Sequence, residues 1–230
     1  MRRLLQSLKV QIAMAIAILT ALFASASLYS QHVIHQQHGD DILVTLASQL
    51  QVNQQHLTLQ AMRYLENAPR DYASYNRDLN LYFEDLKGTR AEIDRLIDAF
   101  ADNRFEPELT GGVEKLQPIL TERTHTTAVE CAVTWRRFLT GLDERIGPDL
   151  AEPRLEWAAE WIVQHHETLE EISGHLFSTL RTDVSRRAQR ADTINRVLLA
   201  TALLVALATG LWFYRRVLFP LSVAVDGFRQ

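Results

Sequence analysis

Apolar residues gather near the two ends of the chain and recur at helical spacing between them. Residues 10–29 and 197–214 contain no charged side chain. A helix of about 20 apolar residues crosses a hydrocarbon core of about 30 Å. The pattern therefore predicts two transmembrane helices, 10–29 and 197–214, on either side of a polar segment, 30–196.

Within residues 30–196, apolar residues recur every three or four positions in four blocks, which is the period of an amphipathic α-helix. Asn53 is the polar member of the first block. The apolar positions are Leu43, Leu46, Leu50, Leu57, Ala61 and Tyr64 in the first block; Tyr72, Tyr75, Leu79, Tyr82, Leu86, Ile93, Leu96 and Phe100 in the second; Leu116, Leu120, Cys131, Trp135, Phe138 and Leu142 in the third; and Leu155, Ala158, Ile162, Leu169, Ile172 and Leu176 in the fourth.

Prolines and glycines mark the ends of these blocks. Pro69 closes the first block, residues 101–112 form a loop after the second, and Gly147 ends the third. Pro118 falls in the first turn of the third block, where proline is tolerated. The fourth block continues without a breaker into residues 197–214. We therefore expect an all-α fold, an up-down-up-down four-helix bundle flanked by two transmembrane helices.

Positive charges next to the two apolar runs indicate which ends face the cytoplasm. Two arginines and a lysine precede the first run within residues 1–9, and Arg215 and Arg216 follow the second. Cytoplasmic flanks of transmembrane helices carry an excess of lysine and arginine. We expect residues 1–9 to be a cytoplasmic lead, both chain ends to lie in the cytoplasm, and residues 30–196 to be exported.

Two features allow other interpretations of these flanks. Residues 24–26, Ala-Ser-Ala, have the form of a signal-peptidase site, so the first run is either an uncleaved anchor or a cleaved signal peptide. Five arginines between Arg181 and Arg196 precede the second run on the exported side, against the positive-inside bias. Long exported segments cross the membrane largely regardless of such charge, so the prediction of two anchors stands.

Composition narrows the function. The formal net charge of −4 gives no reason to expect a nucleic-acid partner. The single cysteine, Cys131, excludes an intramolecular disulfide and fits a small buried side chain. The sequence holds no glycine-rich phosphate loop, no nucleophile elbow and no histidine-box metal motif. We therefore expect no enzymatic activity, no cofactor and no metal within these residues.

Two groups of histidines have spacings that could suggest a metal site. They are His32, His35 and His38, and His165 and His166 near Glu170. Neither group includes a cysteine or a second histidine box that would complete a tetrahedral shell. We interpret them as solvated polar faces, with His165 on the apolar stripe as a satisfied core histidine.

The residues after the second apolar run begin with RRVLFPL, which is followed by Val223, Val225 and Phe228. This stretch resembles the opening of a HAMP linker, a family in which a proline shortly past the membrane precedes a short amphipathic helix. The resemblance implies that residues 215–230 begin such a linker and that Arg215, Arg216 and Pro220 relay a signal. It also implies a parallel homodimer and a longer receptor of which this chain is the input half.

Three stretches of the polar segment are LASQLQVNQQH from Leu46, LNLYFEDLKG from Leu79 and WRRFL from Trp135. They are similar to the input domain of type IV pilus chemoreceptors and nitrate/nitrite sensor kinases. In those families the first helix carries an arginine-bearing box, the second ends an aromatic stripe near a glycine, and the third carries a tryptophan and then a phenylalanine. The resemblance implies a periplasmic sensor domain, residues 30–196, anchored in a bacterial inner membrane.

This sequence departs from that family at the anion-binding arginine of the first-helix box. The stretch offers amides in its place: Gln49, Gln51, Asn53, Gln54 and Gln55. The departure argues against nitrate as the ligand.

A polar layer within the predicted bundle is the candidate ligand site. Counting residues from the membrane along each helix brings Gln49, Arg90, Arg123, Thr124, Thr127 and Arg181 to about one level, together with Ser48, Thr89 and Thr179. Polar groups inside a bundle are costly unless they are satisfied, and neighbouring arginines match a carboxylate or a phosphate. The layer indicates a small anionic ligand. The alternative is that the arginines face solvent or pair with Glu92, Glu122 and Asp183.

These features predict the input half of a membrane signal-transduction receptor of the chemoreceptor, sensor histidine kinase or cyclase class. Its expected partners are the lipid bilayer, a second copy of the chain, and a small anion or a periplasmic protein. The alternative is a membrane-anchored helical rod that tethers partners without switching. A reading frame that continues past Gln230 into a second HAMP helix would favour the receptor, and a stop codon there would favour the tether.

Overall fold

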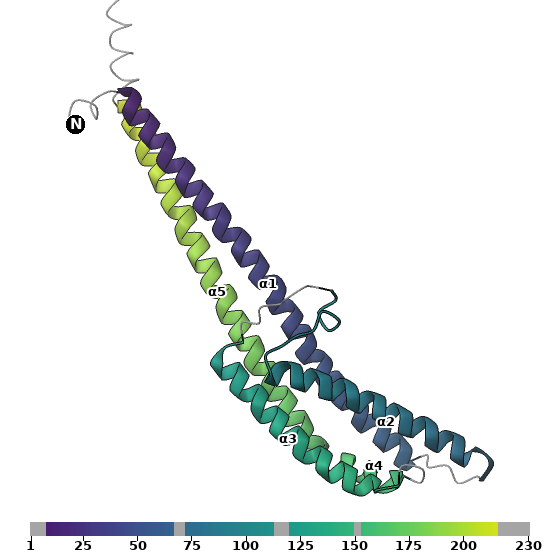
Figure 1. Cartoon of the computed structure of the whole chain (residues 1–230). Coiled ribbons are helices and arrows are strands. Elements are labelled where there is room, and N and C mark those ends of the chain that lie inside the picture. The colour runs from purple at the N-terminus through teal and green to yellow at the C-terminus, as the bar shows by residue number, and fades with distance from the viewer. Residues whose placement is uncertain (1–7, 67–71, 113–119, 150–152, 216–230) are drawn as a thin grey trace, which may run out of the picture. The chain divides into compact units, whose positions relative to one another are not determined.

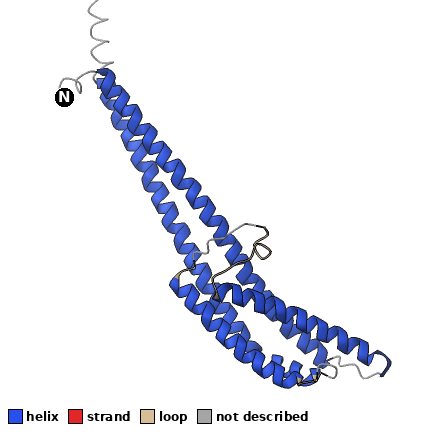
Figure 2. Cartoon of the chain, viewed as in Figure 1, coloured by secondary structure: helices blue, strands red, loops and turns tan. Residues whose placement is uncertain are grey.

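The computed structural model describes residues 8–66, 72–112, 120–149 and 153–215. These residues form five helices: α1 (Leu8–Glu66), α2 (Tyr72–Ala101), α3 (Glu122–Ile146), α4 (Leu155–Gln164) and α5 (His166–Phe213) (Figure 1). Figure 2 shows no strand among the described residues. The predicted all-α class is therefore confirmed.

The chain divides into two compact units. We call residues 38–185 the central unit, and residues 1–37 together with 186–230 the terminal unit. Pro69, Pro118, Arg216 and Pro220, on which several of the sequence expectations rest, lie outside the described residues.

Apolar side chains of the terminal unit are exposed along both of its helices. They are Met14, Ile16, Ile18, Phe23, Leu28 and Ile34 on α1, and Ile194, Val197, Leu199, Leu203, Leu204, Leu207 and Leu211 on α5. α1 and α5 are each long and apolar enough to cross a membrane, and no residue of the most apolar stretch of either helix is buried. An apolar surface of this extent is unfavourable in water. It is typical of helices that lie in the hydrocarbon core of a membrane.

The central unit has one hydrophobic core, to which all five helices contribute. Trp135 of α3 is 1% exposed, stacks on Phe138 with ring centroids 5.2 Å apart, and donates from Nε1 to Asp94 of α2 at 2.5 Å. Tyr64 of α1 stacks on Tyr82 of α2 with ring centroids 4.3 Å apart. Burial raises the pKa of the Tyr82 hydroxyl above its usual range. Aromatic residues from the predicted stripes thus link α1, α2 and α3.

The start of α3 differs from the prediction. The third helix was expected to include Pro118 in its first turn, but α3 begins at Glu122 with Thr121 as its N-cap. The Thr121 hydroxyl accepts a hydrogen bond from the Thr124 backbone N–H at 3.2 Å, which satisfies one of the free donors at the helix start. Two turns further along, Cys131 is 2% exposed, and burial raises its pKa to about 12. The expectation of a buried cysteine is confirmed.

The prediction of one continuous fourth helix is wrong. α4 ends at Gln164 and α5 begins at His166, although neither proline nor glycine lies at the junction. His165 Nδ1 donates to the Trp161 carbonyl at 2.9 Å, and His166 Nδ1 donates to the Val163 carbonyl at 2.7 Å. The break therefore coincides with two imidazoles that bond main-chain carbonyls of the preceding turn.

Trp161 fixes α4 against α3 at a glycine. A Cβ added to Gly141 would lie 2.2 Å from Cζ2 of Trp161, so only glycine fits there. The Trp161 indole donates to the Phe138 carbonyl at 3.2 Å, and the Arg145 guanidinium lies over its ring, 4.3 Å from the centroid. The close contact between α3 and α4 therefore depends on glycine at position 141, which has no side chain.

Replacing Gly141 with alanine is expected to destabilise the chain by about 1–3 kcal/mol, because the new methyl group collides with the Trp161 ring. Gly88 is the matched control, since it lies within α2 and has no atom within 4 Å of an added Cβ. Gly88→Ala should instead stabilise by about 0.5–1 kcal/mol. Thermal unfolding of the full chain in detergent, followed by circular dichroism, measures both. Equal shifts of the unfolding midpoint in the two variants would contradict the close packing of Gly141 against Trp161.

Candidate functional site

The structure does not bring the six predicted ligand residues together. Arg90 of α2 pairs with Asp143, near the end of α3, through contacts of 2.5 and 3.1 Å. Arg123 and Thr124 lie in the first turn of α3, at its opposite end. Counting residues from the membrane therefore gave the wrong register between α2 and α3, and Arg90 lies at a different level from Arg123.

The other predicted residues separate into exposed and buried groups. Gln49, Arg123 and Arg181 have exposed side chains, whereas Thr124 and Thr127 are buried. The interior of this layer therefore contains the hydroxyl groups of the two threonines, and the side chains of Arg123 and Arg181 lie outside it.

A carboxylate lies at the centre of the buried layer. Asp183 of α5 is 8% exposed and accepts hydrogen bonds from the hydroxyls of Thr121 and Thr124, the second at 2.6 Å. Among the described residues, the Thr127 hydroxyl donates within its own helix, to the Arg123 carbonyl at 3.1 Å. The layer joins α3 to α5 through a carboxylate, whereas the sequence predicted arginines at this place.

Two of the three predicted relay residues cannot be placed, because Arg216 and Pro220 lie outside the described residues. Arg215 is exposed and comes directly after Tyr214, which is 57% exposed. An exposed tyrosine followed by an arginine is typical of the interface at which a transmembrane helix leaves the bilayer.

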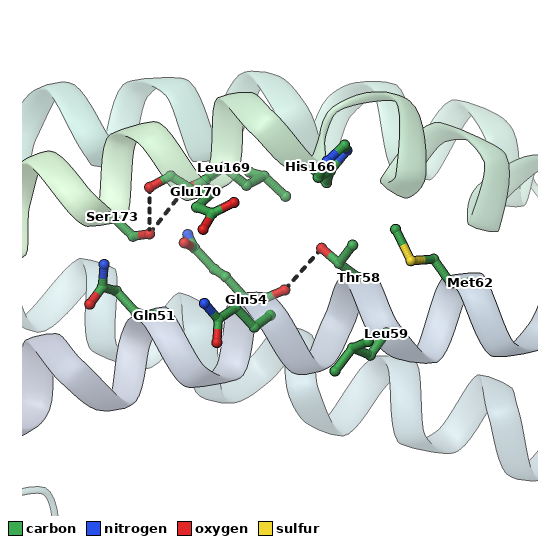
Figure 3. Close-up of a pocket in the computed structure, with 10 residues that line it drawn as sticks. Gln51, Gln54, Thr58, Leu59, Met62, His166, Leu169, Glu170 and Ser173 are labelled. Carbon is green, nitrogen blue, oxygen red and sulfur yellow. Dashed lines mark hydrogen bonds between the residues drawn. The ribbon is translucent and has the colours of Figure 1, made fainter.

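A pocket of the central unit lies between α1 and α5 (Figure 3). It has a volume of about 250 Å³. It is lined by Gln51, Gln54, Gln55, Thr58, Leu59 and Met62 of α1, and by His166, Leu169, Glu170 and Ser173 of α5. It lies beside the break at His165, because His166 is the first residue of α5.

Gln54 is the unusual member of this pocket. Its side chain is 3% exposed, and neither Nε2 nor Oε1 has a hydrogen-bond partner among the residues that the structure describes. Figure 3 shows it extending from α1 toward Glu170 and Ser173 of α5. Buried amides in native proteins are almost always paired, so an unpaired one needs an explanation.

The hydroxyls near Gln54 already donate elsewhere. Thr58 donates to the Gln54 carbonyl at 3.1 Å, and the Ser173 hydroxyl is shared between the carbonyls of Leu169 and Glu170, at 3.0 and 3.2 Å. These hydroxyls therefore bond their own helix backbones, and among the described residues neither of them pairs with the Gln54 amide.

Sequence reasoning named Gln54 only as one of five amides and chose Asn53 as the polar member of the first stripe. In the structure Asn53 is half-buried and donates to Glu92 of α2 at 3.2 Å. Leu50, Gln54 and Leu57 share the buried face of α1. Counted from Leu50 to Leu57, Gln54 divides the interval into four and three residues, and Asn53 divides it into three and four. Both spacings fit a helix, so the pattern alone could not choose between them.

Comparison with known proteins adds no assignment. No protein-family model, no curated protein and no solved structure matches this chain.

Replacing Thr124 with valine is expected to destabilise the chain by about 1–3 kcal/mol, because Asp183 loses one of its hydroxyl donors in a buried position. Thr127→Val is the matched control, since its hydroxyl bonds only the local helix backbone. Its cost should stay below about 1 kcal/mol. Urea unfolding of the full chain in detergent distinguishes the two. A Thr127→Val loss as large as that of Thr124→Val would contradict the role of Asp183.

Replacing Gln54 with methionine is expected to stabilise the chain by about 1–3 kcal/mol, because a buried unpaired amide is exchanged for an apolar side chain of similar shape. Gln60→Met gives the opposite sign, since the Gln60 amide oxygen accepts from buried Thr89 at 3.3 Å. The same unfolding measurement serves for both. If Gln54→Met destabilises as Gln60→Met does, the Gln54 amide has a structural partner.

Proposed function

We propose that this chain is the input part of a transmembrane receptor, in which the central unit meets the stimulus and α1 and α5 carry its effect through the bilayer. One observation supports this most directly. The two helices that hold the membrane-length apolar stretches, α1 and α5, are also the two that line the pocket around Gln54.

The length of the two helices suits them to mechanical relay. α1 runs from Leu8 to Glu66 and α5 from His166 to Phe213, each without interruption. A small shift of one packed helix against another is a known form of switching, since packed interfaces have discrete arrangements. Coupling energies in such systems are typically about 1–3 kcal/mol. Occupation of the pocket would supply a differential contact of that kind.

In this proposal the central unit works as an up-down-up-down four-helix bundle. α1, α2 and α3 form three of its helices, and α4 with the first part of α5 forms the fourth. The contacts of Tyr64 with Tyr82, of Trp135 with Asp94 and of Thr124 with Asp183 support neighbouring positions for the helices concerned.

The proposed location is the inner membrane of a bacterium, with the central unit in the periplasm and both chain ends in the cytoplasm. The apolar exposure of the terminal unit and the position of Arg215 after Tyr214 support it. A second copy of the chain, packed in parallel, is the proposed partner within the membrane.

The proposal is tested by inserting residues into α5 between the central unit and the apolar stretch. The full chain is fused to the cytoplasmic part of a sensor kinase with a measurable reporter. One alanine inserted after Ala191 turns everything beyond it by about 100° and should change reporter output severalfold. Seven inserted residues restore nearly the original face and should restore the output.

Alkaline phosphatase and green fluorescent protein fusions provide the control for topology, since each works on only one side of the membrane. Phosphatase fused within residues 102–112 should be active, and fluorescent protein fused after residue 230 should fluoresce. If the one-residue insertion leaves reporter output unchanged while the topology is intact, the chain is better described as a passive tether. Active phosphatase at the C-terminal end would exclude the relay altogether.

A further inference from the structure

We propose that the pocket between α1 and α5 binds a small uncharged molecule bearing an amide group, which pairs with the side-chain amide of Gln54. The proposal deepens the proposed receptor function and rests on it for the biological role of the ligand, although binding itself is tested separately.

The donor and acceptor of Gln54 define the chemistry of the ligand. The side chain is 97% buried, and its N–H donor and carbonyl acceptor are both free among the described residues. A primary amide presents the same two groups side by side, in the reverse order. A ligand amide can therefore form two hydrogen bonds with Gln54 at once, whereas a lone carbonyl leaves one atom of Gln54 unpaired.

The charges around the pocket disfavour an anion. Among the residues that the structure describes, no lysine or arginine lines it, and Glu170 contributes a carboxylate. His166 donates from Nδ1 to the Val163 carbonyl, which leaves Nε2 as an acceptor in the neutral ring. A carboxylate ligand would thus meet the Glu170 carboxylate and the acceptor of His166, whereas the glutamine amides of α1 that line the pocket offer donors and acceptors alike to an amide.

The remaining walls set the size and shape of the ligand. Leu59, Met62 and Leu169 give the pocket an apolar side. Its volume of about 250 Å³ lies below the range of about 300–1,000 Å³ typical of drug-sized ligands. A single planar ring or a short aliphatic group attached to the amide fits these limits.

A ligand in this pocket would contact both α1 and α5, so its binding would affect how these two helices pack. The pocket has Gln51 and Gln54 on α1 facing Glu170 and Ser173 on α5 (Figure 3). A Cβ added to Gly174 of α5 would lie 3.5 Å from Nε2 of Gln51, so the helices are close at one edge of the pocket. A ligand held by Gln54 would fix the spacing between α1 and α5.

The test uses the full chain in detergent micelles and a matched pair of probes, nicotinamide and nicotinate, which share a ring and differ in amide against carboxylate. Benzamide and benzoate form a second pair. Thermal unfolding is measured over a range of probe concentrations. Nicotinamide or benzamide should raise the midpoint of unfolding by mass action, and the matching carboxylate should not.

Two variants assign the effect to the pocket. Gln54→Met should weaken the amide probe at least about tenfold, because both hydrogen bonds are lost. Gln49→Met is the control, since Gln49 is an exposed amide on the same helix outside the pocket lining, and it should keep the full response. If Gln54→Met does not fold, Gln54→Leu replaces it.

Three results would overturn the proposal. They are equal shifts from amide and carboxylate, an unchanged amide response in the Gln54 variant, and no response to any amide probe at millimolar concentration. Failure of this test leaves the effect of inserting residues into α5 untouched. Binding of the amide together with an insertion-insensitive reporter would instead sustain the site and reject the receptor function.

Discussion

α1 and α5 each combine two kinds of surface along one helix, and this combination governs how the rest of the chain is built. In the terminal unit their apolar side chains, such as Phe23 and Leu204, are exposed, which is a surface that suits hydrocarbon rather than water. In the central unit one stripe of each helix is buried in the core that they share with α2, α3 and α4. Gln54 and Asp183 are two of the buried polar residues on these helices, and they are places where the two helices depart from simple core packing.

These two buried polar residues are satisfied differently. Asp183 is held by the hydroxyls of Thr121 and Thr124, so it acts as a fixed polar joint between α3 and α5. Gln54 has no such joint among the described residues, and a pocket lies beside it. A buried polar group that has its hydrogen-bond partners helps to specify the packing. A buried polar group without partners marks a place where another molecule can supply the hydrogen bonds.

Much of the fold could be predicted from the sequence, because helical periodicity reports which face of each helix is buried. The apolar stripes through Leu50, Trp135 and Leu169 are in the core, as predicted. The register between helices could not be predicted this way, since it depends on particular pairs such as Arg90 with Asp143. The break at His165 was missed for a similar reason: neither proline nor glycine marks it, and it coincides with particular imidazole bonds to main-chain carbonyls.

The single cysteine has a practical consequence for studying motion in this protein. Cys131 is buried and its pKa is raised to about 12, so little of the reactive thiolate forms at neutral pH. Spin labels or fluorophores can therefore be attached to cysteines introduced at exposed positions such as Ser48 of α1 and Arg181 of α5, with the native thiol left in place. The separation between two such labels would report directly on whether these helices change their spacing.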